Sequence, residues 1–326
     1  MISVIIPNFN GERVLGECLE ALSRQTEPDL EVILVDNGSS DDSVRRARKI
    51  RPGLRVIAFD RNRGFAAAVN AGLKAARREL AALLNNDVVV EPSWLAEMKK
   101  ELQADPLTFG VGSKMLLDPE RGRINVVGIK LKAYPESASI GAGRPDQGQY
   151  DRPGQVFGVS AGATLYRRKI FEDVGWFDED YFAYLEDVDL SFRARLLGYR
   201  FRYAPRARAY HKKGWTTRTR MNSSFEIRLN ARNVLFYQYT NLPETLWRRY
   251  RARLLLRHFE LTVRHCLQHL HKGEAGPYLA GLLDFYRLRG RVLEKRLSLQ
   301  ARKRVPDEAI AFWLGREVIP DGVPAP

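Results

Sequence analysis

Four short apolar runs alternate with helix-like segments in the first ninety residues of the chain, and this alternation limits the possible folds most strongly. Gly, Pro, Asn or Asp follows each run within two residues, and the segments between runs carry apolar residues at helical spacing. The runs are residues 2–6, 30–35, 54–58 and 81–84. Because they are apolar without alternation, they fit strands that are covered on both sides. The pattern predicts an α/β fold with a parallel core sheet and helices on both faces.

The remainder of the chain predicts a different organisation. Between residues 110 and 160, Gly and Pro are frequent and apolar stretches are short, which indicates antiparallel strands and a mobile loop around 133–153. We expect a helix over 186–197, a last core strand over 199–204 and basic helices from Ser224 onward. We therefore divide the chain into a domain over 1–223, with a nucleotide-binding half (about 1–110) and an acceptor half (about 111–223), and a helical C-terminal region over 224–326.

The charge balance points to an anionic partner. The chain has 53 Lys and Arg against 39 Asp and Glu, for a net charge of +14, which suits nucleic acid, a phosphorylated metabolite or a membrane surface. Two cysteines, Cys18 and Cys266, are too few for a disulfide framework. We find no apolar run of about 18 residues and no signal-peptide pattern at the N-terminus. These observations predict a cytoplasmic enzyme and exclude a secreted mini-protein, a collagen, a coiled coil and an integral membrane protein.

Polar residues gather where the predicted parallel strands end. Ligands of open parallel sheets bind beyond the carboxyl ends of the strands. A single residue such as Asn10 is explained by turn formation, but a cluster at each of several strand ends predicts a site. The sequence has neither a dinucleotide fingerprint nor a P-loop. The clustered residues are Asn8, Asn10, Asp36, Asn37, Asn62, Asn85, Asn86 and Asp87.

Several segments together resemble the family 2 glycosyltransferases of the GT-A fold. Residues 4–10 (Val-Ile-Ile-Pro-Asn-Phe-Asn), 35–41 (Val-Asp-Asn-Gly-Ser-Ser-Asp) and 62–72 (Asn-Arg-Gly-Phe-Ala-Ala-Ala-Val-Asn-Ala-Gly) carry the likeness. Residues 85–87 (Asn-Asn-Asp) take the place of the family's Asp-x-Asp metal motif. Residues 177–193 are similar to the bacterial rhamnosyltransferase-like branch. The match extends in register over about residues 1–240.

The resemblance implies an inverting, metal-dependent hexosyltransferase. Such an enzyme would move a sugar, of rhamnosyl type by the branch likeness, from a dTDP- or UDP-sugar to a glycan or lipid-linked acceptor in bacterial cell-surface polysaccharide synthesis. Carried over by position, Pro7 and Phe9 lie against the base, and Asp36 or Asn37 accepts from its imide N–H. The full set implied for nucleotide binding is Pro7, Phe9, Asn10, Asp36, Asn37, Asn62, Gly64, Asn70, Asn85 and Asn86.

The resemblance also implies a metal site and a catalytic base. Asp87 is the metal ligand of the motif, and His211 is the second ligand, because the family places a histidine after the last core strand. Mg²⁺ needs few protein ligands when waters and phosphates complete its shell, and an imidazole ligand suits Mn²⁺. Asp187 matches the family's general base, whereas Glu186 and Asp189 are explained by the helix dipole. One base and one metal describe a single displacement, hence inversion.

Basic residues dominate the later part of the chain. No acidic residue occurs over 190–225, where ten basic residues surround His211, and some of these are expected to face the diphosphate. Over 247–257 aromatic residues, leucines and arginines alternate. That pattern predicts peripheral contact with an anionic bilayer at the inner face of the plasma membrane. The alternative is a solvated helix packed on the core.

Two other function classes were weighed. A basic nucleic-acid-binding protein would explain the charge, but the chain has no recognised nucleic-acid motif and its basic excess lies after residue 190. We therefore expect no nucleic-acid partner. A non-catalytic sugar-nucleotide binder would explain Asn85 and Asn86 in the metal motif. Sugar, acceptor, linkage and oligomeric state are not encoded in these motifs.

Overall fold

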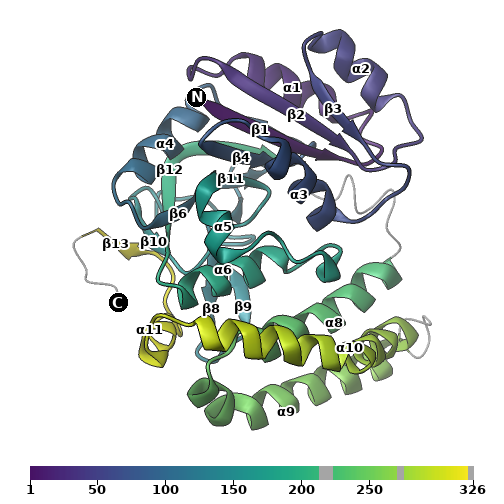
Figure 1. Cartoon of the computed structure of the whole chain (residues 1–326), viewed down its shortest axis with the longest axis vertical. Helices are drawn as coiled ribbons and strands as arrows, with labels where there is room; N and C mark the ends of the chain where they lie inside the picture. The colour runs from purple at the N-terminus through teal and green to yellow at the C-terminus, as the bar shows by residue number, and fades with distance from the viewer. Residues whose placement is uncertain (213–222, 270–274, 322–326) are drawn as a thin grey trace.

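The computed structural model describes residues 1–212, 223–269 and 275–321. One large mixed sheet runs through the molecule, helices cover both of its faces, and long C-terminal helices form a layer at one end (Figure 1). The predicted α/β fold class with a parallel core and a C-terminal helical extension is confirmed.

The N-terminal half is the parallel part of the sheet. β1 lies between β2 and β4, and β3 lies outside β2, all in parallel register. The strands are β1 (Ile2–Asn8), β2 (Leu30–Asp36), β3 (Arg55–Ala58) and β4 (Leu80–Leu84), and the connecting helices are α1 (Leu15–Ser23), α2 (Ser43–Ile50) and α3 (Phe65–Ala75). Each lies where the apolar pattern predicted it, because local sequence decides βαβ units.

The second half of the sheet is mixed. β11 pairs antiparallel with both β4 and β6, whereas β12 runs parallel to β6. The order across the sheet is β13-β10-β12-β6-β11-β4-β1-β2-β3. The elements of this half are β5 (Val88–Val90), α4 (Trp94–Gln103), β6 (Thr108–Leu117), β7 (Ile124–Val126), β8 (Ile129–Leu131), β9 (Ser137–Ser139), β10 (Gly154–Val156), β11 (Ala163–Arg167), η1 (Arg168–Ile170), α5 (Phe171–Val174), η2 (Glu179–Tyr181), α6 (Glu186–Leu196), β12 (Arg200–His211) and β13 (Ile319–Pro320).

Two long strands of this half differ from the prediction. β6 is almost entirely buried, although its sequence contains glycines. A Cβ at Gly110 would lie 2.8 Å from the ring of Tyr166, so this glycine admits a close aromatic contact. β12 continues to His211 rather than ending near Ala204, because the pairing register shifts between Ala204 and Arg208. The shift interrupts the apolar pattern of the sequence, but the strand continues through it.

Side chains on opposite faces of the sheet form two separate cores. Ile2, Val4 and Ile6 of β1 pack with α1 and α4, whereas Ile5 packs with α3, α5 and α6. This two-layer burial is what the strand period of two requires when helices cover both faces. The parallel strands therefore end together at one edge of a rigid sheet.

The C-terminal helices share a third core with the rest of the chain. Phe236 of α8, Leu254 of α9 and Val292 of α10 pack in one cluster with Phe192 of α6. Arg296 donates to the carbonyls of Tyr239 and Leu242 near the end of α8, and β13 returns to pair with β10. No helix among the described residues is long and apolar enough to cross a bilayer. The bounds are α8 (Ser223–Asn241), α9 (Glu244–His269), α10 (Ala275–Arg302) and α11 (Asp307–Ala311).

Segment 133–153, expected as a mobile loop, is anchored to the sheet. The ammonium group of Lys114, which is fully buried on β6, lies 2.7 Å from Asp146 Oδ1 and 2.6 Å from Asp151 Oδ1. The Tyr203 hydroxyl also donates to the carbonyl of Tyr150. The ion pairs of buried Lys114 therefore fix a segment that its Gly- and Pro-rich sequence alone predicts to be mobile.

Lys114→Met should destabilise the protein, because it leaves two carboxylates without their cation. Removing one partner of a buried pair costs about 3–5 kcal/mol in general. Asp151 is 56 % exposed, so we expect a smaller loss, about 1–3 kcal/mol in the free energy of unfolding. Urea denaturation measures it. Arg45→Met, which breaks the exposed pair with Asp42, is the control and should leave the midpoint nearly unchanged; equal midpoints for the two variants would contradict the anchoring role.

Candidate active site

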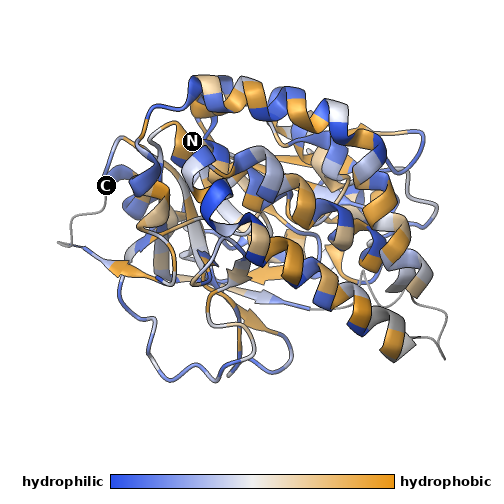
Figure 2. Cartoon of the chain, turned by 90° about the horizontal axis from the view of Figure 1, so that it is seen from below, coloured by the Kyte–Doolittle hydropathy of each residue, from blue (hydrophilic) through white to orange (hydrophobic). Residues whose placement is uncertain are grey.

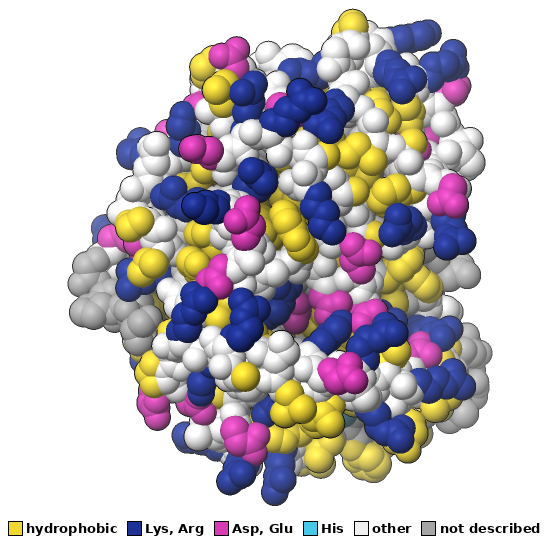
Figure 3. Space-filling view, in the orientation of Figure 1, with side chains coloured by type: hydrophobic (Ala, Val, Ile, Leu, Met, Phe, Trp, Pro, Cys, Tyr) yellow, Lys and Arg dark blue, Asp and Glu magenta, His cyan; other side chains and the backbone are white. Residues whose placement is uncertain are grey.

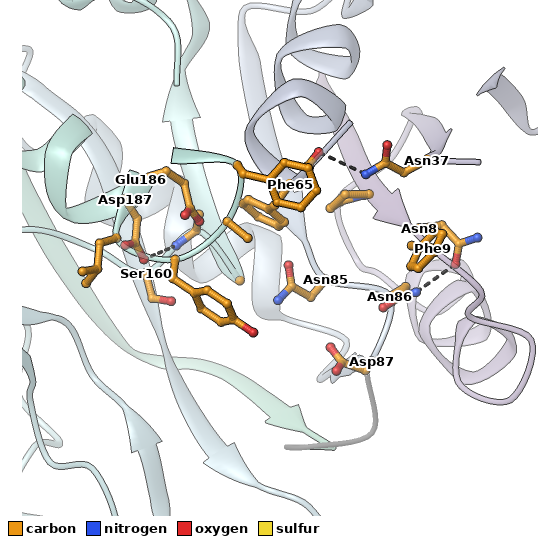
Figure 4. Close-up of a pocket in the computed structure, with 18 of the residues that line it drawn as sticks. Asn8, Phe9, Asn37, Phe65, Asn85, Asn86, Asp87, Ser160, Glu186 and Asp187 are labelled. Carbon is orange, nitrogen blue, oxygen red and sulfur yellow. Dashed lines mark hydrogen bonds between the residues drawn. The ribbon is translucent and has the colours of Figure 1, made fainter. Parts of the chain in front are cut away.

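A pocket of about 410 Å³ lies where β1, β2 and β4 end, facing the start of α6 and the end of β12. In Figure 4, Glu186 and Asp187 lie at one side of the pocket and Phe9 and Asn37 at the other, with Asn85 between them. Most of the predicted site residues line this pocket. They are Pro7, Phe9, Asn37, Asn62, Gly64, Asn85, Asn86, Asp87, Asp187 and His211.

A buried amide holds three strand ends together beneath the pocket. Asn8 Nδ2 lies 3.1 Å from Asp36 Oδ1 and 3.0 Å from Ser43 Oγ, while Asn8 Oδ1 accepts from Asn86 Nδ2 at 2.8 Å. The loop after β1 crosses close above this amide: a Cβ at Gly11 would lie 2.2 Å from Asn8 Oδ1. Asn8 therefore joins the ends of β1, β2 and β4, and Gly11 permits the close approach.

A second amide orders the loop before α3. Asn37 Nδ2 donates to Asn62 Oδ1 (2.9 Å) and to the Gly64 carbonyl (3.0 Å), and Asn37 Oδ1 accepts from the Arg63 N–H (2.8 Å). Gly64 has φ of +91° and approaches the backbone of Phe182 so closely that a Cβ would lie 2.6 Å from its carbonyl oxygen. Only glycine fits that position. These residues line the pocket as a preformed wall.

Three residues of the predicted nucleotide-binding set do not line the pocket. Asn10 Oδ1 accepts from the Ser40 N–H at 2.7 Å. Asp36 accepts the hydrogen bond of the first amide described above. Asn70 donates to the Phe177 carbonyl (2.8 Å) and accepts from the Phe177 N–H (3.0 Å). In the structure these three side chains hold neighbouring loops in place.

Asp87 and His211 face each other at the ends of two adjacent strands, β5 and β12. Val88 of β5 pairs with His211 of β12, which brings the imidazole Nε2 within 3.4 Å of Asp87 Oδ2. His211 Nδ1 lies 2.9 Å from Asn125 Oδ1, which orients the ring so that Nε2 faces the carboxylate. One carboxylate oxygen and one imidazole nitrogen fit a divalent cation whose other ligands are diphosphate oxygens and water. Among the described residues, no group of three or more His, Cys, Asp or Glu is placed to hold a metal without such outside ligands.

Glu186 and Asp187 form a carboxyl pair at the start of α6. Asp187 accepts from the Ala161 N–H (3.3 Å) and from the Val188 N–H (2.8 Å). Glu186 is buried, and its Oε2 has no hydrogen-bond partner in the described part of the chain. Burial and the charge of Asp187 raise the pKa of Glu186 to about 8, and burial also raises the pKa of Asp187. Asp187 receives more donors than Glu186, which favours the negative charge on Asp187 and the proton on Glu186.

A strained loop precedes this pair, and sequence reasoning missed the residue that holds it. Asn233 of α8 is fully buried and directs its amide at three loop carbonyls, at 3.1, 2.8 and 2.8 Å. Left-handed backbone at non-glycine residues is costly and persists only where surrounding structure supports it. The carbonyls belong to Tyr181, Ala183 and Tyr184, and the residues with positive φ are Phe182, Tyr184 and Leu185. α8 thus positions the approach to Asp187.

Asp189, the last acidic residue of the same motif, has a structural role. It is buried, forms an ion pair with Arg193 Nε at 2.9 Å and accepts from Asn241 Nδ2 at 2.9 Å. Asp189 therefore connects α6 with α8.

Several basic residues around His211 pair with carboxylates outside the pocket. Arg200 pairs with Asp105, and Arg202 pairs with Glu101 and Asp321. No Lys or Arg of the described residues lines the pocket, so none of the described basic residues supports the expectation that this stretch faces a diphosphate. Lys213, Arg218 and Arg220 lie outside the described residues.

Glu186→Gln should make the protein more stable at high pH. An unfolded glutamate titrates near pH 4.3, so from about pH 5 to about 8 the folded protein holds a proton that the unfolded chain has lost. Stability of the natural protein therefore falls as pH rises through this window. Thermal unfolding of variant and natural protein at pH 5.5, 7 and 8.5 measures the gap.

The gap should be small at pH 5.5 and widen toward pH 8.5. Glu120→Gln, which alters an exposed carboxyl, is the control and should show no widening. Parallel curves for Glu186→Gln and the natural protein would show that Glu186 is ionised in the fold at neutral pH.

Comparisons with known proteins place this geometry in context. The family model described as "Glycosyl transferase family 2" matches residues 3–175, more than half of the chain. A second model, "Glycosyl transferase family group 2", matches residues 145–270. The chain is 24% identical over 208 residues to the poly-beta-1,6-N-acetyl-D-glucosamine synthase of Staphylococcus epidermidis. That match covers 63% of this chain and 48% of the synthase, so the chain spans about half the length of the curated relatives it matches.

Solved structures share the fold. S. aureus TarS 1-349 in complex with UDP-GlcNAc matches with a TM-score of 0.60 and 19% identity, over 99% of this chain and 98% of that one. The mannosyltransferase PcManGT from Pyrobaculum calidifontis, in complex with GDP-Man and Mn²⁺, matches with a TM-score of 0.52 and 18% identity, over 95% of this chain and 77% of that one. At these identities the likeness supports the predicted GT-A-type fold.

Proposed function

The chain belongs to glycosyltransferase family 2, and from this premise we propose an inverting, metal-dependent enzyme that moves a sugar from a nucleoside diphosphate donor to a glycan or lipid-linked acceptor. One observation carries the proposal: a single pocket holds both the facing Asp87–His211 pair and the Glu186–Asp187 pair. The first pair suits a diphosphate with its cation, and the second suits the removal of a proton.

The donor is held at the ends of the parallel strands. Pro7 and Phe9 offer an apolar face for a base, and the amides of Asn37, Asn62 and Asn85 lie along the same wall. We propose a pyrimidine nucleotide, UDP or dTDP, with a rhamnosyl-type sugar as the first candidate from the likeness of residues 177–193. A bound Mg²⁺ or Mn²⁺ would neutralise charge on the leaving diphosphate. Asp87 and His211 would bind that ion.

Asp187 acts on the acceptor. As the ionised member of its pair, it accepts the hydroxyl proton while the acceptor oxygen attacks the anomeric carbon. The bond to the diphosphate breaks on the opposite side, so the configuration inverts. Glu186 stays protonated beside it and limits the charge that the pocket must hold.

The C-terminal helices suit contact with an anionic membrane in cell-surface polysaccharide synthesis. Along α9, Leu256, Phe259, Val263 and Leu267 recur on one face and are 58, 64, 38 and 67 % exposed. Seen from the side of these helices, hydrophobic and hydrophilic residues alternate along them (Figure 2). Exposed arginines stand near this face, among them Arg253 and Arg264. Apolar faces beside basic groups bind anionic bilayers.

Asp187→Asn should remove transfer while leaving donor binding nearly intact. A positioned general base contributes about 10²–10⁴ in rate, so turnover should fall at least about a hundredfold at an unchanged dissociation constant for UDP. Steady-state transfer assays and calorimetry with UDP and Mn²⁺ measure the two quantities. A variant that keeps more than about a tenth of the turnover would refute the assignment of Asp187 as base.

Asp87→Ala should abolish the metal-stimulated part of UDP binding, and His211→Ala should weaken it. Both remove a ligand that faces the proposed ion. Calorimetry with UDP, with and without Mn²⁺, measures the effect. Asp60→Ala, which changes an exposed carboxylate that does not line the pocket, is the matched control. Transfer that survives excess chelator in the natural protein would sink the metal role of both residues.

Phe259→Glu should reduce binding to anionic vesicles, because it places a negative charge on the apolar face of α9. Binding should also fall as salt rises, since surface charges are screened over about 8 Å at 0.15 M ionic strength. Co-sedimentation with phosphatidylglycerol and phosphatidylcholine vesicles measures both effects. Leu107→Glu makes the same change at a 45 % exposed leucine away from α9 and should bind like the natural protein. If all three proteins stay in the supernatant, the membrane contact is wrong.

A further inference from the structure

A second cavity lies outside the pocket, between the C-terminal helices. It has a volume of about 470 Å³ and lies between α9 and α10, with α8 as its floor. Its walls are almost wholly apolar, and its edges are exposed: Leu255 is 60 % and Tyr286 59 % exposed. Leu235, Trp247, Phe285 and Leu293 are among the lining side chains. We refer to this cavity as the α9–α10 groove.

The groove and the active-site pocket are linked by an intermediate cavity that shares a lining residue with each. An intermediate cavity of about 330 Å³ lies between them. Asn230 lines both the active-site pocket and this intermediate cavity, and His258 lines both the intermediate cavity and the groove. α8 forms a wall throughout, and from Asn230 to Tyr239 it advances about 14 Å at the usual helical rise. A molecule with its reacting end beside Asp187 and its tail in the groove would follow α8 past Asn230 and His258.

The groove is uncharged inside and positive at its edge. Burial lowers the pKa of His258 to about 4, so its ring is neutral at pH 7, and it lies 3.0 Å from Gln238 Oε1. No carboxylate of the described residues lines the groove. Arg289 stands at the exposed edge over the ring of Tyr286, 4.0 Å from its centroid, and has no carboxylate partner in the described part of the chain. Arg289 also donates to the Tyr286 carbonyl at 3.2 Å. A neutral apolar interior with a guanidinium at the mouth that no described carboxylate neutralises suits a hydrocarbon chain that carries a phosphate.

The groove is open at a glycine in the middle of α10. A Cβ at Gly290 would meet nothing within 4 Å, although glycine disfavours a helix interior by about 1 kcal/mol relative to alanine. Figure 3 shows hydrophobic side chains gathered at the lower end of the face drawn, where the C-terminal helices lie, with Lys and Arg beside them. The exposed edge of the groove, at Leu255 and Tyr286, thus stands on the same C-terminal helices that carry the surface we assign to the membrane.

We propose that the α9–α10 groove binds the hydrocarbon tail of a lipid-linked acceptor, whose sugar end reaches Asp187 through the cavity at Asn230. The inference rests on the proposed function, since it requires an acceptor attached to a lipid. The apolar surface of α9 contacts the bilayer, and the groove takes one chain out of it. This arrangement keeps the acceptor's reacting hydroxyl at the base while its tail stays in an apolar environment.

Binding of farnesyl phosphate, a fifteen-carbon isoprenoid with one phosphate, tests the groove directly. Calorimetry below the micelle concentration should give saturable one-to-one binding to the natural protein. Gly290→Phe adds a ring at a lining position where a Cβ meets nothing within 4 Å, and should weaken that binding at least tenfold. Gly276→Phe makes the same change on α10, at an open position that lines none of the three cavities, and should bind like the natural protein. Dimethylallyl phosphate, with the same phosphate and five carbons, should bind at least tenfold more weakly.

Four results would overturn the proposal: no binding of farnesyl phosphate, equal binding by Gly290→Phe, equal binding of the short analogue, or a dimer of the natural protein that Gly290→Phe dissociates. The last would assign the groove to a second copy of the chain. UDP binding with Mn²⁺ is measured on the same samples. If UDP fails to bind the natural protein, the proposed donor function fails, whereas loss of farnesyl phosphate binding alone leaves that function standing.

Discussion

The hydrogen bonds of one buried amide, Asn8, are the interaction on which the site depends. They connect the end of β1 to three other sites: Asp36 at the end of β2, Ser43 at the start of α2, and Asn86 after β4. Leaving this buried amide without its hydrogen bonds would cost about 1–3 kcal/mol. This cost favours a single arrangement of the loops that follow β1, β2 and β4. The pocket wall, with Asn85 and Asp87 in the same loop as Asn86, is then already formed before a donor binds.

A second constraint is the placement of two carboxyls side by side in a buried position. Two negative charges there would repel, so donors from the backbone select Asp187 as the ionised member and leave the proton on Glu186. The left-handed loop before the pair holds it at the pocket, and Asn233 of α8 stabilises that loop. The C-terminal helices thus support the carboxyl that we propose as the catalytic base, as well as carrying the surface we assign to the membrane.

The sequence allowed prediction of what local pattern decides. The four parallel strands and the polar residues at their ends follow from βαβ units of fixed geometry, and the resemblance carried Asp87, Asp187 and His211 into the same pocket. Long-range packing decides the rest. The insertion of β11 between β4 and β6 and the bulge in β12 have no local signal. Asn233 acts on a loop about fifty residues earlier in the chain, so nothing around it in the sequence marks its role. The resemblance predicts that Asn10, Asp36 and Asn70 bind the nucleotide; their side chains make hydrogen bonds to neighbouring loops that no local pattern predicts.

A single ionised base opposite a diphosphate site is the centre of the account, and the stereochemistry of transfer tests it most directly. Proton NMR of the sugar first released from a nucleoside diphosphate donor, by slow transfer to water, reports the anomeric configuration and needs no knowledge of the natural acceptor. The account predicts that the released sugar has the configuration opposite to that of the donor. Release with the donor's configuration retained, before the anomers equilibrate, would contradict a single displacement with Asp187 as base.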